Sequence, residues 1–155
     1  MTARSARPLT AADLEAVAAI ERAVFTDPWS QQSFGDLLGL DHVRGFVVEG
    51  GQGVIVGYAV CSQVADEGEI LNLATAPGAR REGIGRALLA AVLRWLGERG
   101  AVKVFLEVRR SNEAAIAMYE AAGFATLGVR PNYYRRPTED AVTMVLAVAS
   151  GSARK

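Results

Sequence analysis

A glycine-containing turn between a predicted strand and a predicted helix constrains the fold of this chain most. Residues 69–75 have the composition of a strand, and a Pro-Gly pair at 77–78 ends it. The helix that follows runs from about Gly83 to Gly100. Its apolar stripe consists of Ile84, Leu88, Val92 and Trp95. Backbone N–H groups point outward at the positive end of a helix, so the turn predicts a site for an anion such as phosphate.

Three glycine-rich motifs compete for this turn. A P-loop requires G-x-x-x-x-G-K-[ST], which the sequence lacks. A dinucleotide-binding turn requires a third glycine where Leu88 stands. The pattern R-x-x-G-x-G is met by Arg80, Gly83 and Gly85, and its glycines would let the backbone amides of residues 81–86 approach a pyrophosphate. A tight turn without any ligand remains the simpler alternative.

The other segments predict further helices and strands. Helices are expected at residues 9–25, in the later part of 27–38 after a turn, and from 111 to just before Gly123, with Thr10, Ser30 and Ser111 as caps. Strands are expected at residues 45–49, 53–64, 102–108, 124–129 and 141–148, with a polar, aromatic loop at 130–140. The nearly continuous apolar run at 53–64 is typical of a strand covered on both faces. The order of elements predicts an α/β fold of mixed type.

Length and charge restrict the function classes. The 155 residues suit one domain, with flexible ends expected at 1–7 and 150–155. Seventeen basic residues balance seventeen acidic ones, so we expect no direct nucleic acid binding and no membrane binding. No apolar run approaches about 18 residues, and no secretory leader is evident, so a cytoplasmic location is expected. Cys61 is the only cysteine, which excludes an internal disulfide.

Two linked segments resemble the GNAT superfamily of N-acetyltransferases. "LNLATAPGARREGIGRALL" is similar to the strand, turn and helix with which that family binds acetyl-CoA. "LEVRRSNEAAIAMYEAAGF" resembles the strand and helix that follow, including the pattern N-x-x-A-x-x-x-Y-x-x-x-G-F. The resemblance implies a single GNAT-like domain over residues 1–155, with a central mixed β-sheet flanked by helices. It also implies acetyl-CoA as the co-substrate and no metal.

The resemblance assigns the acetyl-CoA site to the strand end, the turn and the next helix. The implied residues are Leu73, Ala74, Thr75, Arg80, Arg81, Glu82, Gly83, Ile84, Gly85, Arg86 and Asn112. Backbone groups of the first three would pair with the acetyl and pantetheine part of the donor as an added strand does, and one amide there is the best candidate for holding an oxyanion. The arginines add charge to the phosphates or are solvated surface residues, and Asn112 contacts the donor or caps its helix.

Glu107 and Tyr119 are the implied catalytic residues. Glu107 would act as general base through a water molecule, and Tyr119 would protonate the departing CoA sulfur. From position alone, Glu107 is equally explained by an ion pair with Arg109 or Arg110, and Tyr119 by half-buried packing. A peptide α-amine has a pKa of about 7.7–8.0 and a lysine about 10.4, so an α-amine needs less help from a weak base.

The acceptor side carries a narrower resemblance. "DPWSQQSF" and "RPNYYRRPTEDAVTM" resemble GNAT enzymes that acetylate the N-terminal alanine of ribosomal proteins, which implies such a protein N-terminus as the acceptor. Trp29, Tyr133 and Tyr134 are candidates for the wall of the peptide site or for packing residues. Two alternatives stay open: a lysine or small-molecule amine acceptor, and a non-catalytic acetyl-CoA-binding module that docks to a protein partner in a complex.

Neither the one histidine nor the one cysteine predicts a further site. His42 alone cannot supply a His-rich zinc site, and a His-based triad is excluded in practice. Cys61 lies within an apolar strand and is more typical of a core residue than of a nucleophile. We therefore expect direct transfer in a ternary complex, without an acyl-enzyme.

Overall fold

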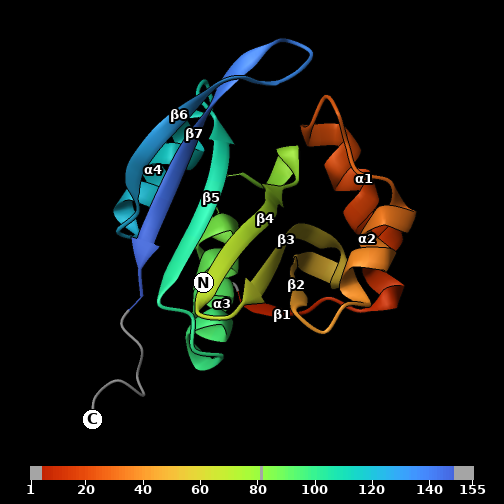
Figure 1. The fold of residues 1–155 in the computed structure, drawn as a ribbon. Helices are drawn as coiled ribbons and strands as arrows, with labels where there is room; N and C mark the ends of the chain where they lie inside the picture. Colours follow the sequence, from red (N-terminus) through yellow and green to blue (C-terminus); the bar gives the residue numbers. More distant parts are fainter. Residues whose placement is uncertain (1–4, 81, 149–155) are drawn as a thin grey trace.

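The computed structural model describes residues 5–80 and 82–148, which form one mixed sheet with helices on both faces (Figure 1). The strands are β1 (Ala6–Pro8), β2 (Val43–Glu49), β3 (Ile55–Val64), β4 (Glu67–Thr75), β5 (Lys103–Arg109), β6 (Ala125–Tyr134) and β7 (Glu139–Ala147). The helices are α1 (Leu14–Val24), α2 (Gln31–Leu38), α3 (Ile84–Glu98) and α4 (Glu113–Ala121). The predicted α/β class and central mixed sheet are confirmed.

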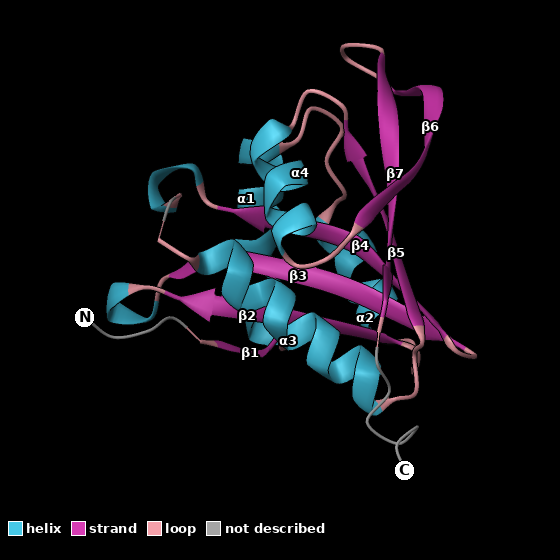
Figure 2. Cartoon of the chain, turned by 90° about the vertical axis from the view of Figure 1, so that its left-hand side faces the viewer, coloured by secondary structure: helices cyan, strands magenta, loops and turns pink. Residues whose placement is uncertain are grey.

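The sheet order is β1-β2-β3-β4-β5-β7-β6. Only β4 and β5 pair in parallel, and α3 is the crossover that such a pair requires. Helices α3 and α4 cover one face of the sheet, and α1 and α2 cover the β2–β4 half of the other (Figure 2). Among the described residues, no helix lies over the β5–β7 half of that second face.

Two cores flank β3, because successive side chains of a strand point to opposite faces. Tyr58 and Val60 pack with α1 and α2, and Ala59 and Cys61 pack with α3. The prediction of a strand covered on both faces is therefore confirmed. Within α3 the apolar stripe differs in one residue from the prediction.

The difference on α3 concerns Trp95 and its neighbour. Leu96 is fully buried in the core, while Trp95 is half-buried. The guanidinium of Arg99 lies 4.6 Å from the Trp95 ring centroid and that of Arg44 lies 5.7 Å from it. The indole ring thus forms a border between core and surface that its mixed character suits.

The feature that positions the site is a divergence of β4 from β5. Their last paired residues are Ile70 and Leu106. Just there, Asn72 pairs with Val60 while Ile70 pairs with the next residue of β3, so Leu71 is an extra residue in β4. Such a bulge bends a strand and redirects its side chains. From this point the two strands separate, as Figure 1 shows between their labels and their upper ends.

Two predicted boundaries are wrong. Part of the expected flexible end is β1, which pairs with β2 and is held by ion pairs of Arg7 with Asp13 and Glu49. The pairing strand β2 and the Glu49 partner, 42 residues from Arg7, are distant in sequence, so no local pattern reveals the strand. The expected loop at 130–140 is mostly strand, because β6 continues to Tyr134 through an irregular register and a left-handed Asn132. The other expected flexible end, at 150–155, lies outside the described residues.

Candidate active site

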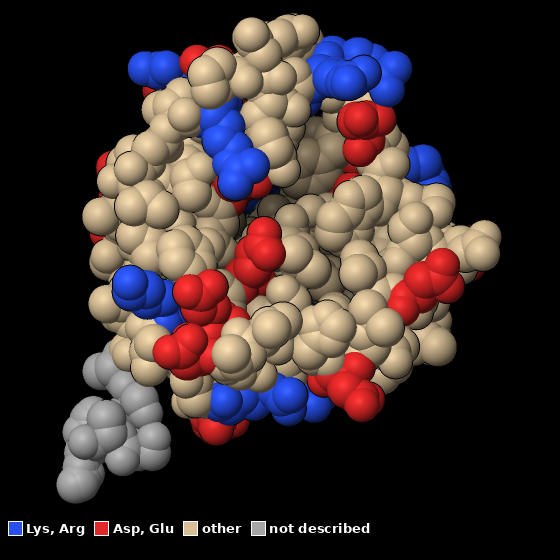
Figure 3. Space-filling view, viewed as in Figure 1, with Lys and Arg blue, Asp and Glu red and all other residues tan. Residues whose placement is uncertain are grey.

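A cavity of about 500 Å³ lies where β4 and β5 separate. Its walls come from the segment between α1 and α2, the bulged part of β4, the end of β5, α4, and the β6–β7 hairpin. Figure 3 shows the hollow on the face of the molecule, with acidic and basic side chains at its margin. The predicted residues that line it are Trp29, Leu73, Glu107, Asn112, Tyr119, Tyr133 and Tyr134. One cavity therefore brings together both implied catalytic residues and all three acceptor candidates.

The glycine turn lies outside this cavity, next to the end of β4. Gly83 precedes α3 with φ +79°, a left-handed conformation that favours glycine, and the space where a Cβ would lie is open. Gly85 has a different role, since a Cβ there would come within 2.9 Å of the Met118 sulfur on α4. Open space over the positive end of a 15-residue helix fits an anionic group.

The other predicted donor-site residues divide into exposed and buried groups. Arg80, Glu82 and Arg86 are exposed, whereas the side chains of Ala74 and Ile84 are in the core, so only their backbone groups can meet a ligand. Arg81 lies outside the described residues. Thr75 lies close to the Cβ position of Gly85, which places the end of β4 beside the start of α3.

Glu107 is the first residue of β5 beyond its pairing with β4. Its Oε2 forms an ion pair of 2.6 Å with Nε of Arg130, which reaches across from β6. Hydrogen bonding to Glu107 raises the pKa of the Tyr133 phenol. Burial and the charge of Glu107 raise the pKa of Glu69, which also lines the cavity. Glu107 therefore does form an ion pair, as the structural alternative predicted, but its partner is Arg130 and not Arg109 or Arg110.

Tyr119 projects from α4 and is only 5% exposed. Its ring packs edge-on against Phe124 with centroids 5.5 Å apart. Burial raises its pKa above the ordinary value for a phenol, so the hydroxyl keeps its proton at neutral pH. Asn112 lines the cavity and also accepts a hydrogen bond from the amide of Ala115, 3.2 Å away, so it does cap α4.

Aromatic rings form much of the acceptor side. Tyr133 and Tyr134 pack perpendicular to each other, with centroids 5.0 Å apart. The guanidinium of Arg109 lies 4.5 Å from the centroid of Tyr134, and burial raises the pKa of that tyrosine to about 12. Trp29 packs on Phe34 of α2 at 5.2 Å. The three rings thus line the cavity beside charged groups, since Arg109 lies over the ring of Tyr134.

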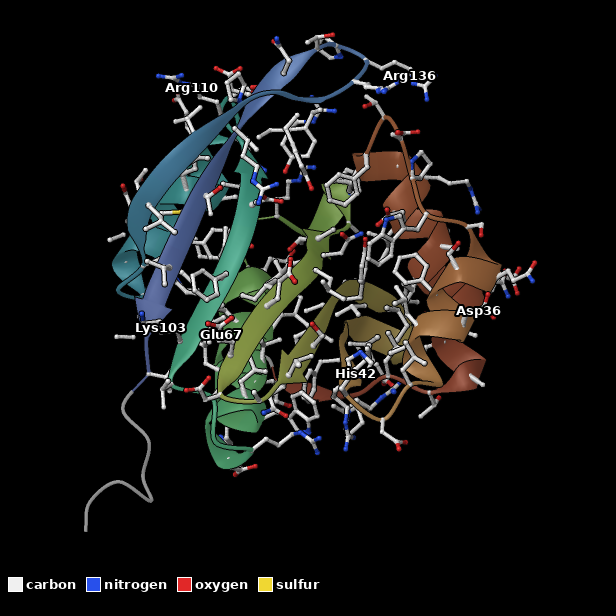
Figure 4. The ribbon with its side chains drawn as sticks, viewed as in Figure 1. Asp36, His42, Glu67, Lys103, Arg110 and Arg136 are labelled. Atoms are coloured by element: carbon white, nitrogen blue, oxygen red, sulfur yellow. The ribbon has the colours of Figure 1, made fainter. Side chains whose placement is uncertain are left out.

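Two loops meet over the acceptor side. Arg109 donates to Thr26 Oγ1 at 3.1 Å and to the Arg135 carbonyl at 2.8 Å. Arg136 forms an ion pair of 2.9 Å with Asp27, and Figure 4 shows Arg136 at the hairpin end that reaches toward α1. The segment before α2 and the β6–β7 loop are therefore joined, although they are 109 residues apart in the chain.

Sequence reasoning missed the buried carboxylate of Glu21. This side chain lines the cavity, is 2% exposed, and accepts hydrogen bonds from Asn72, Tyr58 and the amide of Trp29. Its position was a clue, because Glu21 follows Val17 by four residues and so falls on the apolar face of the predicted helix. Asn72 gave no comparable sign, since the face of the sheet to which its side chain points depends on the bulge in β4.

The two residues predicted to lie outside the chemistry are remote from the cavity. His42 is exposed in a turn before β2, as its label in Figure 4 shows. Cys61 is buried in β3, and this burial raises its pKa to about 12, which opposes formation of a thiolate. The described part of the chain contains no group of three His, Cys, Asp or Glu side chains that could hold a metal. Within the same residues, no helix is both long and apolar enough to cross a bilayer.

Comparison with known proteins finds the same architecture. The model of the acetyltransferase (GNAT) family matches residues 14–124. The [ribosomal protein bS18]-alanine N-acetyltransferase of Escherichia coli K12 is 37% identical over 145 residues, which cover 91% of this chain and 95% of the relative. N-alpha-acetyltransferase RimI of Mycobacterium tuberculosis is 38% identical over 142 residues, 88% and 87% of the two chains.

The likeness extends to three dimensions. The crystal structure of the ribosomal-protein-S18-alanine N-acetyltransferase from E. coli matches with a TM-score of 0.87 and 34% identity, over 98% of both chains. The family match ends at residue 124, before β6, whereas this structural match includes the hairpin that carries Tyr133 and Tyr134. The chain belongs to the acetyltransferase (GNAT) family.

Proposed function

We propose that this protein is an N-alpha-acetyltransferase that transfers the acetyl group of acetyl-CoA to the N-terminal alanine of a ribosomal protein. The observation that carries this function is the single cavity in which Glu107 and Tyr119 meet three aromatic acceptor residues. The names of the similar proteins from E. coli and M. tuberculosis support the class of acceptor. Ribosomal proteins are made in the cytoplasm, so we place the reaction there.

The donor side fits acetyl-CoA in two parts. Residues Leu71–Thr75 of β4 have no β5 partners in register, which leaves an edge that can pair with the extended pantetheine arm. The turn at Gly83 and the first amides of α3 would hold the pyrophosphate, with Arg80 and Arg86 near enough in sequence to add charge. Acetyl-CoA, when bound, supplies an acetyl group activated as a thioester.

Glu107 is the proposed proton acceptor for the attacking amine, directly or through a water molecule. Arg130 pairs with its Oε2 and the Tyr133 hydroxyl also hydrogen-bonds to this carboxylate, whose two oxygens offer about four acceptor positions, so positions remain for the acceptor. An α-ammonium with a pKa near 8 gives up its proton more easily than a lysine ammonium with a pKa near 10.4, so a weak base such as a carboxylate is better suited to an α-amine. Glu107 thus favours an N-terminus as the acceptor.

Tyr119 is the proposed proton donor to the departing sulfur. Because its pKa is raised by burial, the phenol is fully protonated at the pH at which a peptide α-amine becomes neutral. The two proposed roles are therefore compatible in one pH range. Hydrogen bonds from amides of Leu73–Thr75 would hold the oxyanion that develops during the attack.

The joined loops restrict what can enter. The contacts of Arg109 with Thr26 and Arg135 join two segments that line the cavity together with Trp29 and Tyr134, so an acceptor would have to enter a space bounded by these joined loops. A narrow chain end meets this condition more readily than a folded surface. This geometry supports a flexible protein N-terminus.

The test measures CoA release with acetyl-CoA and a short peptide that begins with Ala and contains lysines. A matched peptide has a blocked N-terminus and the same free lysines. Turnover with the free N-terminus alone is the expected result. Equal turnover with both peptides would move the acceptor to lysine. Tight acetyl-CoA binding with no turnover of either peptide would contradict the proposed enzyme activity and support a binding module.

A further inference from the structure

A buried carboxylate joins the two sides of the cavity. Glu21 lies in the last turns of α1, and its side chain is directed to the sheet and not to solvent. Asn72 Nδ2 donates to both of its oxygens, at 2.9 Å to Oε1 and 3.1 Å to Oε2. The backbone amide of Trp29 donates to Oε2 at 2.9 Å, and the Tyr58 hydroxyl donates to Oε1.

These four bonds use the full capacity of the carboxylate. Two oxygens offer about four lone-pair positions, and each oxygen here accepts two hydrogen bonds. No acceptor position remains for a substrate ammonium group or for a proton in transit. Glu21 therefore cannot serve the reaction as base or as ammonium ligand without breaking bonds that it already makes, even though it lines the cavity.

The donors come from segments with different tasks in the site. Trp29 belongs to the segment that forms the acceptor wall, and its amide fixes the backbone of that segment. Asn72 is the residue directly after the extra Leu71 of the β4 bulge, on the edge proposed to meet the donor. Tyr58 belongs to β3, beneath both. The carboxylate thus holds the acceptor wall at a fixed place relative to the bulge.

Burying the Glu21 carboxylate costs free energy, and this cost argues that the acceptor wall must be held firmly in place. A buried carboxylate is unfavourable unless it is fully hydrogen-bonded, and an apolar residue would pack α1 equally well against the sheet. Desolvation, followed by the charge of Glu21, raises the pKa of Tyr58 well above its ordinary range. Tyr58 therefore stays a donor, and all groups around the carboxylate point their hydrogens at it.

We propose that Glu21 is a positioning residue for the acceptor, which sets acceptor affinity by holding the Phe25–Trp29 wall on the bulge of β4. This inference rests on the proposed function, because the acceptor is taken to be a peptide N-terminus. It predicts a change in KM for the peptide that is separate from KM for acetyl-CoA and from the overall stability of the fold.

The experiment compares Glu21→Ala, Glu21→Gln and Val17→Ala in the full chain, with steady-state kinetics and thermal unfolding. Val17 is the matched control, because it is fully buried on the same face of α1 one turn earlier and makes only apolar contacts. Hydrogen bonds to a charged group predict a rise of about tenfold or more in peptide KM for Glu21→Ala, with acetyl-CoA KM changed by less than about twofold.

Glu21→Gln should give a smaller rise in peptide KM, because its one amide oxygen can still accept from Trp29. Val17→Ala should lower Tm with peptide KM unchanged. The inference is overturned if peptide KM rises equally in Val17→Ala, which would make it an effect of helix packing. A loss of kcat in Glu21→Ala with KM unchanged would also overturn it, since that result points to a part in the chemistry.

A second pair of variants decides the matter if Glu21→Ala does not fold. Asn72→Ala removes the hydrogen bonds between Glu21 and the β4 bulge and should raise peptide KM. Tyr58→Phe removes the hydrogen bond from β3 to Glu21 and should lower Tm alone. The reverse outcome would contradict the inference. If the unaltered protein turns over no Ala-starting peptide, the proposed acceptor and this inference fall together. If the unaltered protein is active and the Glu21 variants behave as Val17→Ala does, only the inference is overturned.

Discussion

The donor and acceptor sides of the site are built in different ways. Apart from Asn112, the proposed donor side is one continuous stretch of the chain, from Leu73 at the end of β4 to Arg86 in the first turn of α3. The acceptor side is assembled from segments such as Thr26 and Arg135, which are 109 residues apart in the chain. A local segment can keep its geometry through the conformations of a few residues. A composite wall keeps its geometry only through side-chain bonds between segments, so the two sides should respond differently to substitution.

Glu107 lies where the two sides meet, and its substitution should have the largest effect. Glu107→Gln removes the proposed base but keeps the size of the side chain, and we expect kcat to fall about a hundredfold or more at pH 7. The deficit should shrink above pH 8, because the acceptor α-amine is then already neutral. A pH profile of kcat measures this. Glu69→Gln, in the same cavity, is the control, and an equal loss there would show that Glu107 has no special part.

Tyr119→Phe tests the proposed proton donor and should cost less than loss of the base. A thiol has a pKa of about 8.5, so its thiolate leaves fairly well without help, and we expect a fall in kcat of about ten- to a hundredfold. The phenyl ring keeps the packing on Phe124, so Tm should hardly change. CoA release and thermal unfolding measure the two effects. A large drop in Tm with unchanged kcat would mean that Tyr119 is only a packing residue.

Gly83→Ala tests the donor side alone. An L-residue in the left-handed conformation costs roughly 1–2 kcal/mol, so the turn should relax and KM for acetyl-CoA should rise about five- to thirtyfold. KM for the peptide should not change. Gly78→Ala is the matched control in the same turn, since a Cβ has open space there and the backbone is not left-handed. Equal effects of the two variants would remove the special conformation of Gly83 as the cause.

Asp27→Asn tests the acceptor side and should have the smallest effect. Its ion pair with Arg136 is largely exposed, and exposed pairs contribute only about 0–1 kcal/mol, so peptide KM should rise no more than about fivefold. Added salt should reduce the difference between the variant and the unaltered protein. The exposed Asp36 of α2, labelled in Figure 4, provides the control Asp36→Asn. A change in acetyl-CoA KM would contradict the separation of the two sides.

The same division decides what the sequence could predict. The mixed sheet, the glycine turn and the capped helix after Asn112 follow from local patterns of apolar residues, glycine and caps. Arg109 could not be recognised as the residue that joins two loops, because its partners, Thr26 and the Arg135 carbonyl, are brought to it only by the complete sheet.

The hairpin shows the same limit in another way. Pro131 and Asn132 suggested a loop, yet β6 continues through them because β7 pairs with both ends of the irregular stretch. Glu21 left a trace, a charge on an apolar helix face, but only the fold shows the donors that make such a charge tolerable. Local geometry was thus predictable, and the partners of buried polar groups were not.

The contact between Gly85 and Met118 has a consequence for the choice of donor. Met118 lies against the start of α3, and Tyr119 is the next residue along α4. With Tyr119 as the proposed proton donor, the anion-binding turn and the proton-donating hydroxyl belong to one packed unit. The distance between the turn and the Tyr119 hydroxyl is then fixed, because a shift of α4 would push Met118 into Gly85 of α3. A thioester on a much shorter arm would not reach both ends at once. On the proposed function, we expect selectivity for the length of the carrier to depend on an apolar contact that touches neither end of it.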